Sequence, residues 1–142
     1  TPHAEFNVFV DPEAAQQVFD TAFGDMTLIG LDVTHRATLD RSVWERAGAR
    51  QSPSAQLAHM AYAESFTERG KGGCYLHDPM AVAIAVDPTL ARCTAGSIAV
   101  VNDGDERGKT TVTPGAGGPR IAESIDVERF LALFLERLDL GP

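Results

Sequence analysis

The chain has 142 residues, of which 44% are hydrophobic and 23% are charged, a composition typical of one folded domain with its own core. Its net charge of −8 comes without any cluster of basic residues, which argues against nucleic acid and anionic membrane surfaces as partners. No apolar run approaches the ~20 residues that a membrane-spanning helix needs.

The two cysteines, Cys74 and Cys93, belong to no zinc-binding pattern. Two thiols in a chain of this size indicate a reducing, cytoplasmic location, with a single disulfide between them as the alternative. The chain starts at Thr1 rather than at a methionine and reaches a strand-like segment within four residues. We therefore expect a fragment or a processed product rather than a complete gene product.

The first segment predicts a β-strand from Glu5 to Val10. Phe6, Val8 and Val10 alternate with the other residues and would share one face of the strand. Glu5 and Asn7 would then point together to the opposite face, where a carboxylate and a carboxamide could bind a polyhydroxylated ligand. A solvent-facing polar side of an edge strand explains the same spacing equally well.

A helix and a second strand are expected next. Asp11 followed by Pro12 is typical of a helix start, and Gly24 would end this helix after about Ala22. The nearly continuous apolar run over residues 26–33 predicts a strand buried on both faces, as in a parallel sheet. Strand, helix and strand together form a βαβ unit, whose crossover should be right-handed.

His35 follows the carboxyl end of this expected strand, the edge at which ligands collect in open α/β sheets. A histidine at such a place more often bonds a loop carbonyl. Two further helices are expected over residues 40–48 and 54–69. On the second, Tyr62 and Phe66 lie one turn apart, and core packing is the preferred explanation for at least one of these rings.

His77 and Asp78 stand at the expected start of another helix, after a glycine-rich joint over residues 70–73. Asp78 would be the N-cap and Pro79 the first helical residue, before an apolar run that ends near Val86. Helix N-termini attract anionic groups and ligands. From these residues alone, an ordinary cap beside a surface histidine is the preferred explanation.

The last part of the chain predicts a β-hairpin and a C-terminal helix. The hairpin strands are expected over residues 97–101 and 110–113, joined by a polar loop. Asp126 would cap the final helix, which carries one apolar stripe. The stripe consists of Val127, Phe130, Leu131, Phe134, Leu135 and Leu138.

Four segments in order resemble the inosine-uridine-preferring nucleoside hydrolases. They are Ala4–Asn7 with Asp11–Ala15 ("AEFN…DPEAA"), Gly30–His35 ("GLDVTH"), His77–Ala83 ("HDPxAVA") and Gly108–Thr110 ("GxT"). The resemblance spans nearly the whole chain but only the C-terminal half of the family's domain. The aspartate-rich "DTDPGxDD"-type motif of the family's first half does not occur here.

The resemblance implies an α/β fold with residues 1–142 as a single segment of the nucleoside hydrolase domain. That segment would be the C-terminal part of an open, Rossmann-like, mostly parallel sheet flanked by helices, with a late β-hairpin and a C-terminal helix. The family hydrolyses the N-glycosidic bond of a ribonucleoside to ribose and free base, through a transition state that resembles an oxocarbenium ion. Calcium is its metal, which holds the ribose hydroxyls and lowers the pKa of a bound water.

By the same resemblance, Asp78 is a calcium ligand and His77 donates a proton to, or contacts, the leaving base. Calcium and a helix N-terminus would both lower the pKa of His77, so a partner that keeps its proton available is needed. That partner is not identifiable from the sequence.

The remaining roles implied by the resemblance concern substrate binding. Glu5 and Asn7 would bond ribose hydroxyls, with Phe6 close by. Tyr62 and Phe66 lie where the family places base-binding residues, although no motif determines their register. The base preference stays open.

Asp78 is the one calcium ligand that the resemblance assigns to this chain, and two interpretations follow. Calcium takes about six to eight oxygen ligands, which Asp78 alone cannot supply, so we expect the isolated chain to be inactive and to need the missing N-terminal half. The alternative is a non-catalytic truncated fragment or an assembly module. Such a fragment would pair with that half or with a second copy of itself as a homo-oligomer.

Overall fold

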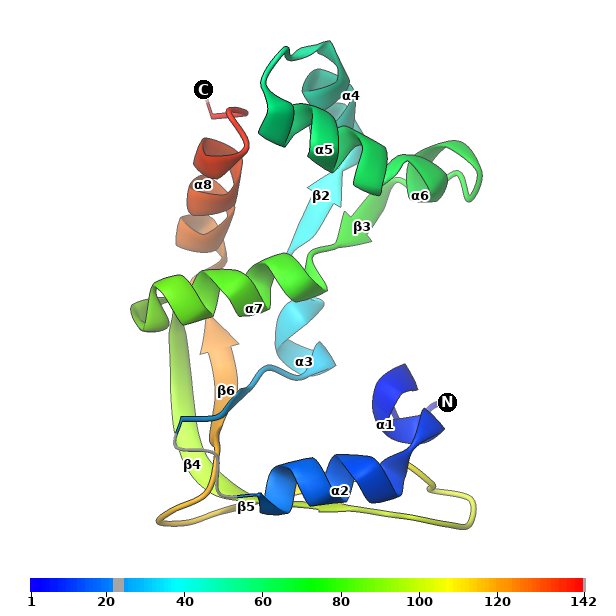
Figure 1. Cartoon of the computed structure of the whole chain (residues 1–142), viewed down its shortest axis with the longest axis vertical. Coiled ribbons are helices and arrows are strands. Elements are labelled where there is room, and N and C mark those ends of the chain that lie inside the picture. Colours follow the sequence, from blue (N-terminus) through cyan, green and yellow to red (C-terminus); the bar gives the residue numbers. More distant parts are fainter. Residues whose placement is uncertain (22–24, 142) are drawn as a thin grey trace. The chain divides into compact units, whose positions relative to one another are not determined.

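The computed structural model describes residues 1–21 and 25–141 (Figure 1). The expected end of the helix that starts at Pro12, at Ala22 and Gly24, lies outside these residues. The chain divides into two compact units, each made of two chain segments. The first unit comprises residues 1–30 and 92–123, and the second comprises residues 31–91 and 124–142.

A four-stranded sheet in the order β1-β6-β4-β5 forms the larger sheet of the α/β fold. Its strands are β1 (Thr27–Leu28), β4 (Ala91–Val100), β5 (Thr110–Pro114) and β6 (Arg120–Ile125). β1 pairs with β6 in parallel, and β4 pairs with β5 antiparallel with Ile98 opposite Val112. The α/β class and the late hairpin are thus confirmed, whereas β6 was not predicted.

The predicted strand from Glu5 to Val10 is wrong, because this segment forms helix α1 (Phe6–Val10). The carboxylate of Glu5 accepts hydrogen bonds from the backbone N–H groups of Asn7 at 2.9 Å and Val8 at 2.6 Å, so it caps the first turn. Only Val8 is buried, while Phe6 is 78% exposed. Residues two apart do not face each other on a helix, so the expected shared face of Glu5 and Asn7 does not exist.

Helix α2 (Pro12–Asp20) begins as predicted. Asp11 is its N-cap and accepts a hydrogen bond from the backbone N–H of Ala14 at 2.9 Å, and Pro12 follows in the first turn. The helix lies on the sheet, where the side-chain amide of Gln16 donates to the Ile98 carbonyl at 3.1 Å and accepts from the Val100 N–H at 2.7 Å (Figure 1). This one side chain therefore joins α2 to β4.

Two features of the first unit require a glycine at position 108. Its φ of +80° lies in the left-handed region that favours glycine. A Cβ at this position would come within 2.7 Å of the Phe9 Cα atom and within 2.9 Å of the Ala4 Cβ atom. The glycine of the "GxT" segment is thus required by backbone packing against α1.

The predicted strand over residues 26–33 is only partly correct. β1 covers two residues of it, and Leu31–Thr34 form helix α3, closed by a hydrogen bond from the His35 N–H to the Leu31 carbonyl at 2.9 Å. A short apolar run does not distinguish a buried strand from a buried helical turn. His35 therefore follows a helix rather than the end of a strand, and the expected βαβ unit is not formed as predicted.

The second unit contains a two-stranded ladder that the sequence did not indicate. β2 (Thr38–Asp40) pairs antiparallel with β3 (Gly73–Tyr75), and Thr38 lies opposite Tyr75. Gly73, expected in a flexible joint, is part of this ladder. The Leu76 N–H donates to the Ala37 carbonyl at 3.2 Å, which continues the pairing beyond the strands.

Three helices connect the two strands of this ladder. They are α4 (Arg41–Ala49), α5 (Pro53–Ala61) and α6 (Ala63–Thr67). The expected helix over residues 54–69 is broken at Tyr62, whose φ of −99° and ψ of 2° end α5 and begin α6. Phe66 is 1% exposed and stacks on Trp44 with ring centroids 5.1 Å apart, so its ring belongs to the core.

The second unit is completed by α7 (His77–Val86), the 3₁₀ turn η1 (Pro88–Leu90) and α8 (Val127–Arg137). Asp126 caps α8 as predicted and accepts a hydrogen bond from the Arg129 N–H at 3.1 Å. Arg129 also forms an ion pair with Asp87 at 2.9 Å, which joins the end of α7 to the start of α8. Within the described residues, no helix is both long and apolar enough to cross a membrane.

Candidate active site

His77 and Asp78 occupy the first turn of α7. The predicted N-cap is wrong by two positions, because Leu76 is the N-cap and Asp78 is already helical. Pro79 is tolerated there because the N–H groups of a first turn have no helical acceptor. Leu76 is fully buried, and its carbonyl accepts from the Met80 N–H at 3.1 Å, so the turn that carries these two predicted site residues is anchored in the core.

The ladder of the second unit brings Thr34 beside His77. Because Thr38 pairs with Tyr75 and Ala37 bonds to Leu76, the chain just before Ala37 runs alongside the start of α7. Thr34 Oγ1 lies 2.8 Å from His77 Nδ1, a hydrogen-bond distance. One ring nitrogen of His77 is therefore engaged within the protein.

The rings of His35 and Tyr75 lie close to the ring of His77. His35 stacks on Tyr75 with centroids 4.2 Å apart, and the His77 ring lies 5.4 Å from His35 and 5.7 Å from Tyr75. Burial lowers the pKa of His77, the charge of His35 lowers it further, and the charge of Asp78 opposes both. The arrangement favours a neutral imidazole at His77.

We expect His77 in the metal-free chain to titrate below the ~6.5 of an unperturbed imidazole, because burial and His35 disfavour its charged form. As the pH falls through about 6.5, the unfolded chain takes up this proton before the folded chain does, so the free energy of unfolding decreases. The loss continues until the pH passes the folded pKa. NMR titration with a chelator present measures the midpoint, and a His77→Gln chain should lack this part of the pH dependence. A midpoint at or above that of free histidine would contradict the prediction.

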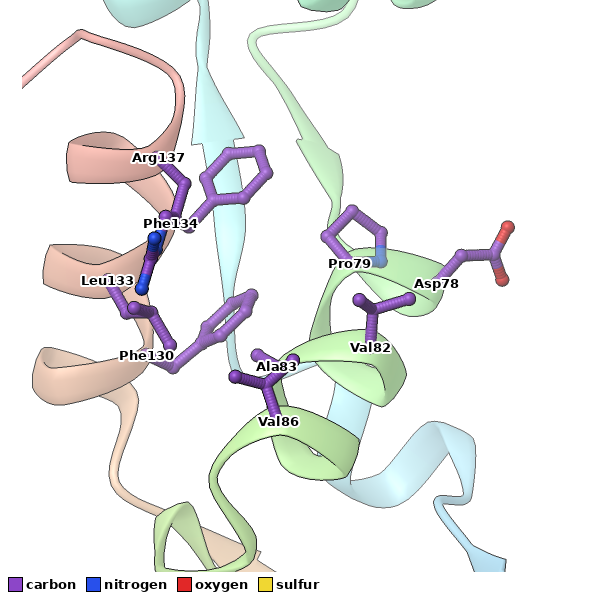
Figure 2. Close-up of a pocket in the computed structure, with 9 residues that line it drawn as sticks. All are labelled: Asp78, Pro79, Val82, Ala83, Val86, Phe130, Leu133, Phe134 and Arg137. Atoms are coloured by element: carbon purple, nitrogen blue, oxygen red, sulfur yellow. The ribbon is translucent and has the colours of Figure 1, made fainter. Parts of the chain in front are cut away.

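Asp78 presents its carboxylate to solvent. Among the described residues it has no hydrogen-bond or ion-pair partner, and Figure 2 shows it turned away from α8. Tyr62 belongs to the same electrostatic neighbourhood: burial raises the pKa of its hydroxyl, and electrostatic interactions with Cys74 and Asp78 raise it further. Tyr62 is half-buried, which leaves part of its ring accessible.

An apolar groove of about 600 Å³ lies between α7 and α8 (Figure 2). Its apolar lining includes Val82, Val86, Phe130 and Phe134. Asp78 and Arg137 are the ionisable residues that line it. Of the two predicted site residues at the start of α7, Asp78 therefore also lines this groove.

Asp78 fits a calcium ion as one ligand. Its oxygens are of the hard type that calcium prefers, and they are accessible and unengaged by other described residues. Within residues 1–21 and 25–141, no group of three or more His, Cys, Asp or Glu side chains forms a metal site. The described residues thus contain no complete metal site of these side chains.

The other predicted site residues are divided between the units. Glu5, Phe6 and Asn7 belong to the first unit, where the carboxylate of Glu5 caps α1 and the other two side chains are exposed. Tyr62 and Phe66 belong to the second unit. The burial of Phe66 agrees with the core-packing interpretation for that ring.

Sequence reasoning missed Thr34 and Tyr75 as neighbours of His77. The available signal was Thr34 directly before His35 in "GLDVTH", but these two residues were expected to follow the end of a strand. The pairing of β2 with β3, which brings the segments together, leaves no local sequence pattern.

Comparison with known proteins identifies the family. The profile of the inosine-uridine preferring nucleoside hydrolases matches residues 1–132. The chain belongs to the nucleoside hydrolase family. This confirms the resemblance drawn from the four sequence segments.

Curated nucleoside hydrolases match nearly the whole chain. The inosine-uridine preferring nucleoside hydrolase of Leishmania major is 30% identical over 98% of the chain and 47% of its own length. The pyrimidine-specific ribonucleoside hydrolase RihA of Salmonella newport is 34% identical over 97% of the chain and 48% of its own length. The chain therefore spans about half the length of these relatives.

Solved nucleoside hydrolases share the fold. A plant nucleoside hydrolase, PpNRh1, superposes with a TM-score of 0.85 at 28% identity, covering 97% of this chain and 48% of its own. A purine-preferring ribonucleoside hydrolase from Gardnerella vaginalis gives a TM-score of 0.78 at 31% identity, covering 96% and 46%. The α/β architecture seen here is thus that of the nucleoside hydrolases.

Proposed function

We propose that this chain forms part of a calcium-dependent hydrolase that cleaves the N-glycosidic bond of ribonucleosides to ribose and free base. The observation that carries the proposal is the position of His77 and Asp78 in the first turn of α7, in a chain of this family. Names of the relatives support the substrate class: one is called inosine-uridine preferring and another pyrimidine-specific.

His77 is proposed to contact the leaving base and to donate a hydrogen bond to it from its ring N–H. Breaking the N-glycosidic bond leaves negative charge on the base, and a donor at this point lowers the barrier. Nδ1 of His77 is engaged by Thr34 Oγ1, which leaves Nε2 as the nitrogen that can meet a base. Tyr62 is proposed as a base-binding side chain, and its position in the electrostatic neighbourhood of Asp78 supports this role.

Asp78 is proposed as a calcium ligand. When bound, the ion would act as a Lewis acid towards a water molecule and hold the ribose hydroxyls. Because this chain contributes a single carboxylate, we propose that further ligands come from the half of the domain that the chain does not match.

The ribose is proposed to bond Glu5 and Asn7, with Phe6 close by. The support is the "AEFN" resemblance, not the earlier strand argument, since α1 replaces that strand. Each carboxylate oxygen of Glu5 keeps acceptor capacity beyond its one backbone hydrogen bond. A cytoplasmic location is also proposed, and the free thiols of Cys74 and Cys93 support it.

A chimera tests the proposed function. The chain would replace the matching segment of the Leishmania major relative, and release of free base from inosine and uridine would be measured with calcium or a chelator present. We expect hydrolysis by the chimera that the chelator abolishes, and none by the isolated chain. Hydrolysis that persists in the chelator would contradict calcium dependence. A folded chimera without hydrolysis, shown by circular dichroism, would contradict the proposal and favour the non-catalytic assembly module.

A further inference from the structure

We propose that Thr34 is a positioning residue for His77: its hydroxyl donates to Nδ1, which fixes the ring and keeps the proton of the neutral imidazole on Nε2. The functional meaning of this inference rests on the proposed role of His77 as a hydrogen-bond donor to the leaving base. The contact itself is a property of the folded chain and can be tested without any reaction.

The direction of the hydrogen bond follows from the burial of Thr34. The residue is 3% exposed, and its hydroxyl lies 2.8 Å from His77 Nδ1. Among the described residues, His77 is the only hydrogen-bond partner of this hydroxyl. A buried O–H that donates to nothing is costly, so its proton must be directed at Nδ1. Nδ1 then accepts, and the neutral ring carries its hydrogen on Nε2.

The backbone holds Thr34 in place from two sides. Thr34 is the last residue of α3, which is closed by the hydrogen bond from the His35 N–H to the Leu31 carbonyl at 2.9 Å. After it, the Ala37 carbonyl accepts from Leu76 at 3.2 Å, and the β2–β3 ladder follows. Since Leu76 directly precedes His77, the same pairing sets the positions of donor and acceptor.

The remaining freedom of the His77 ring is restricted by its neighbours. His35 and Tyr75 stack on each other, and their centroids lie 5.4 Å and 5.7 Å from that of His77. With Nδ1 engaged by Thr34, Nε2 is the ring nitrogen left for a ligand. A leaving base would therefore meet an N–H group whose direction was set before binding, which is the geometry needed for a hydrogen bond to the charge that develops on the base.

The first test uses the 142-residue chain itself, labelled with ¹⁵N. Long-range ¹H–¹⁵N spectra, at a pH well above the pKa of imidazole, distinguish protonated from unprotonated ring nitrogens. We expect a protonated Nε2 and an unprotonated Nδ1 at His77. The conservative variant Thr34→Ser should keep this pattern, whereas Thr34→Val should give a mixture of both tautomers. A protonated Nδ1 in the unmodified chain would overturn the inference, whether or not the variants fold.

The second test measures turnover in the chimera with the Leishmania major relative. Thr34→Val should lower kcat by about 10–100-fold with little change in KM, as expected when a group that orients a functional side chain is lost. Thr34→Ser should restore most of the rate. If Thr34→Val lowered only the amount of folded protein, and kcat per folded molecule stayed unchanged, the positioning role would be wrong.

The two tests separate this inference from the proposed function. If the spectra show the Nε2–H tautomer but no chimera hydrolyses nucleosides, the proposed function fails and the contact stands. If the chimera is active and the spectra show a protonated Nδ1, the positioning role fails while the proposed function stands.

Discussion

If Asp78 is a calcium ligand as proposed, its replacement with alanine should lower nucleoside hydrolysis by the chimera at least about a thousandfold, because several kcal/mol of transition-state stabilisation would depend on the bound calcium. Asp78 is exposed and has no partner among the described residues, so its loss should cost the fold little. Only the favourable interaction of an acidic side chain with the start of α7 is lost, about 0.3–1 kcal/mol.

The measurement combines turnover with calcium titration. Asp78→Ala and Asp78→Asn should both weaken calcium binding to the chimera, while Asp103→Ala serves as the matched control. Asp103 is an exposed aspartate of the hairpin loop, and its removal should leave turnover unchanged. A folded Asp78→Ala chimera that keeps a tenth of the activity or more would show that Asp78 is not a calcium ligand.

Replacing Phe66 with alanine should destabilise the second unit by about 3–5 kcal/mol, the cost of removing a large buried aromatic side chain. Phe66 is 1% exposed, stacks on Trp44 with centroids 5.1 Å apart, and lies under the guanidinium of Arg41 at 5.4 Å. A domain of ordinary stability has about 5–15 kcal/mol in total, so this loss would remove a large part of it.

Urea unfolding of the 142-residue chain checks this prediction. Phe6→Ala is the control, because Phe6 is 78% exposed and should change the free energy of unfolding by less than about 0.5 kcal/mol. Phe66→Leu should recover most of the stability. If Phe66→Ala instead unfolded at the same urea concentration as the unmodified chain, the ring would not be a core element and its assignment to the base would regain support.

Short sequence patterns predicted helix starts and the hairpin correctly, because these features depend on contacts between residues that are near in sequence. Asp11 and Asp126 cap their helices as predicted, and the late hairpin pairs as expected. The start of α7 was placed within two residues for the same reason.

The strand predicted from Glu5 to Val10 failed because alternation of apolar residues was the only signal considered. The carboxylate of Glu5 accepts hydrogen bonds from the backbone N–H groups of Asn7 and Val8, and these stabilise a helical turn that the pattern alone does not reveal. The same limit explains why Leu31–Thr34 form a helix within an apolar run.

The sequence by itself determined the family of the chain and two of its candidate functional residues, His77 and Asp78, because the family's motifs are local. Only the tertiary structure decided the surroundings of His77. Thr34 is 43 residues away in the chain and reaches Nδ1 through the pairing of β2 with β3. Such pairing depends on the free energy of the whole unit rather than on any short pattern, so the partner of the histidine emerged only from the fold.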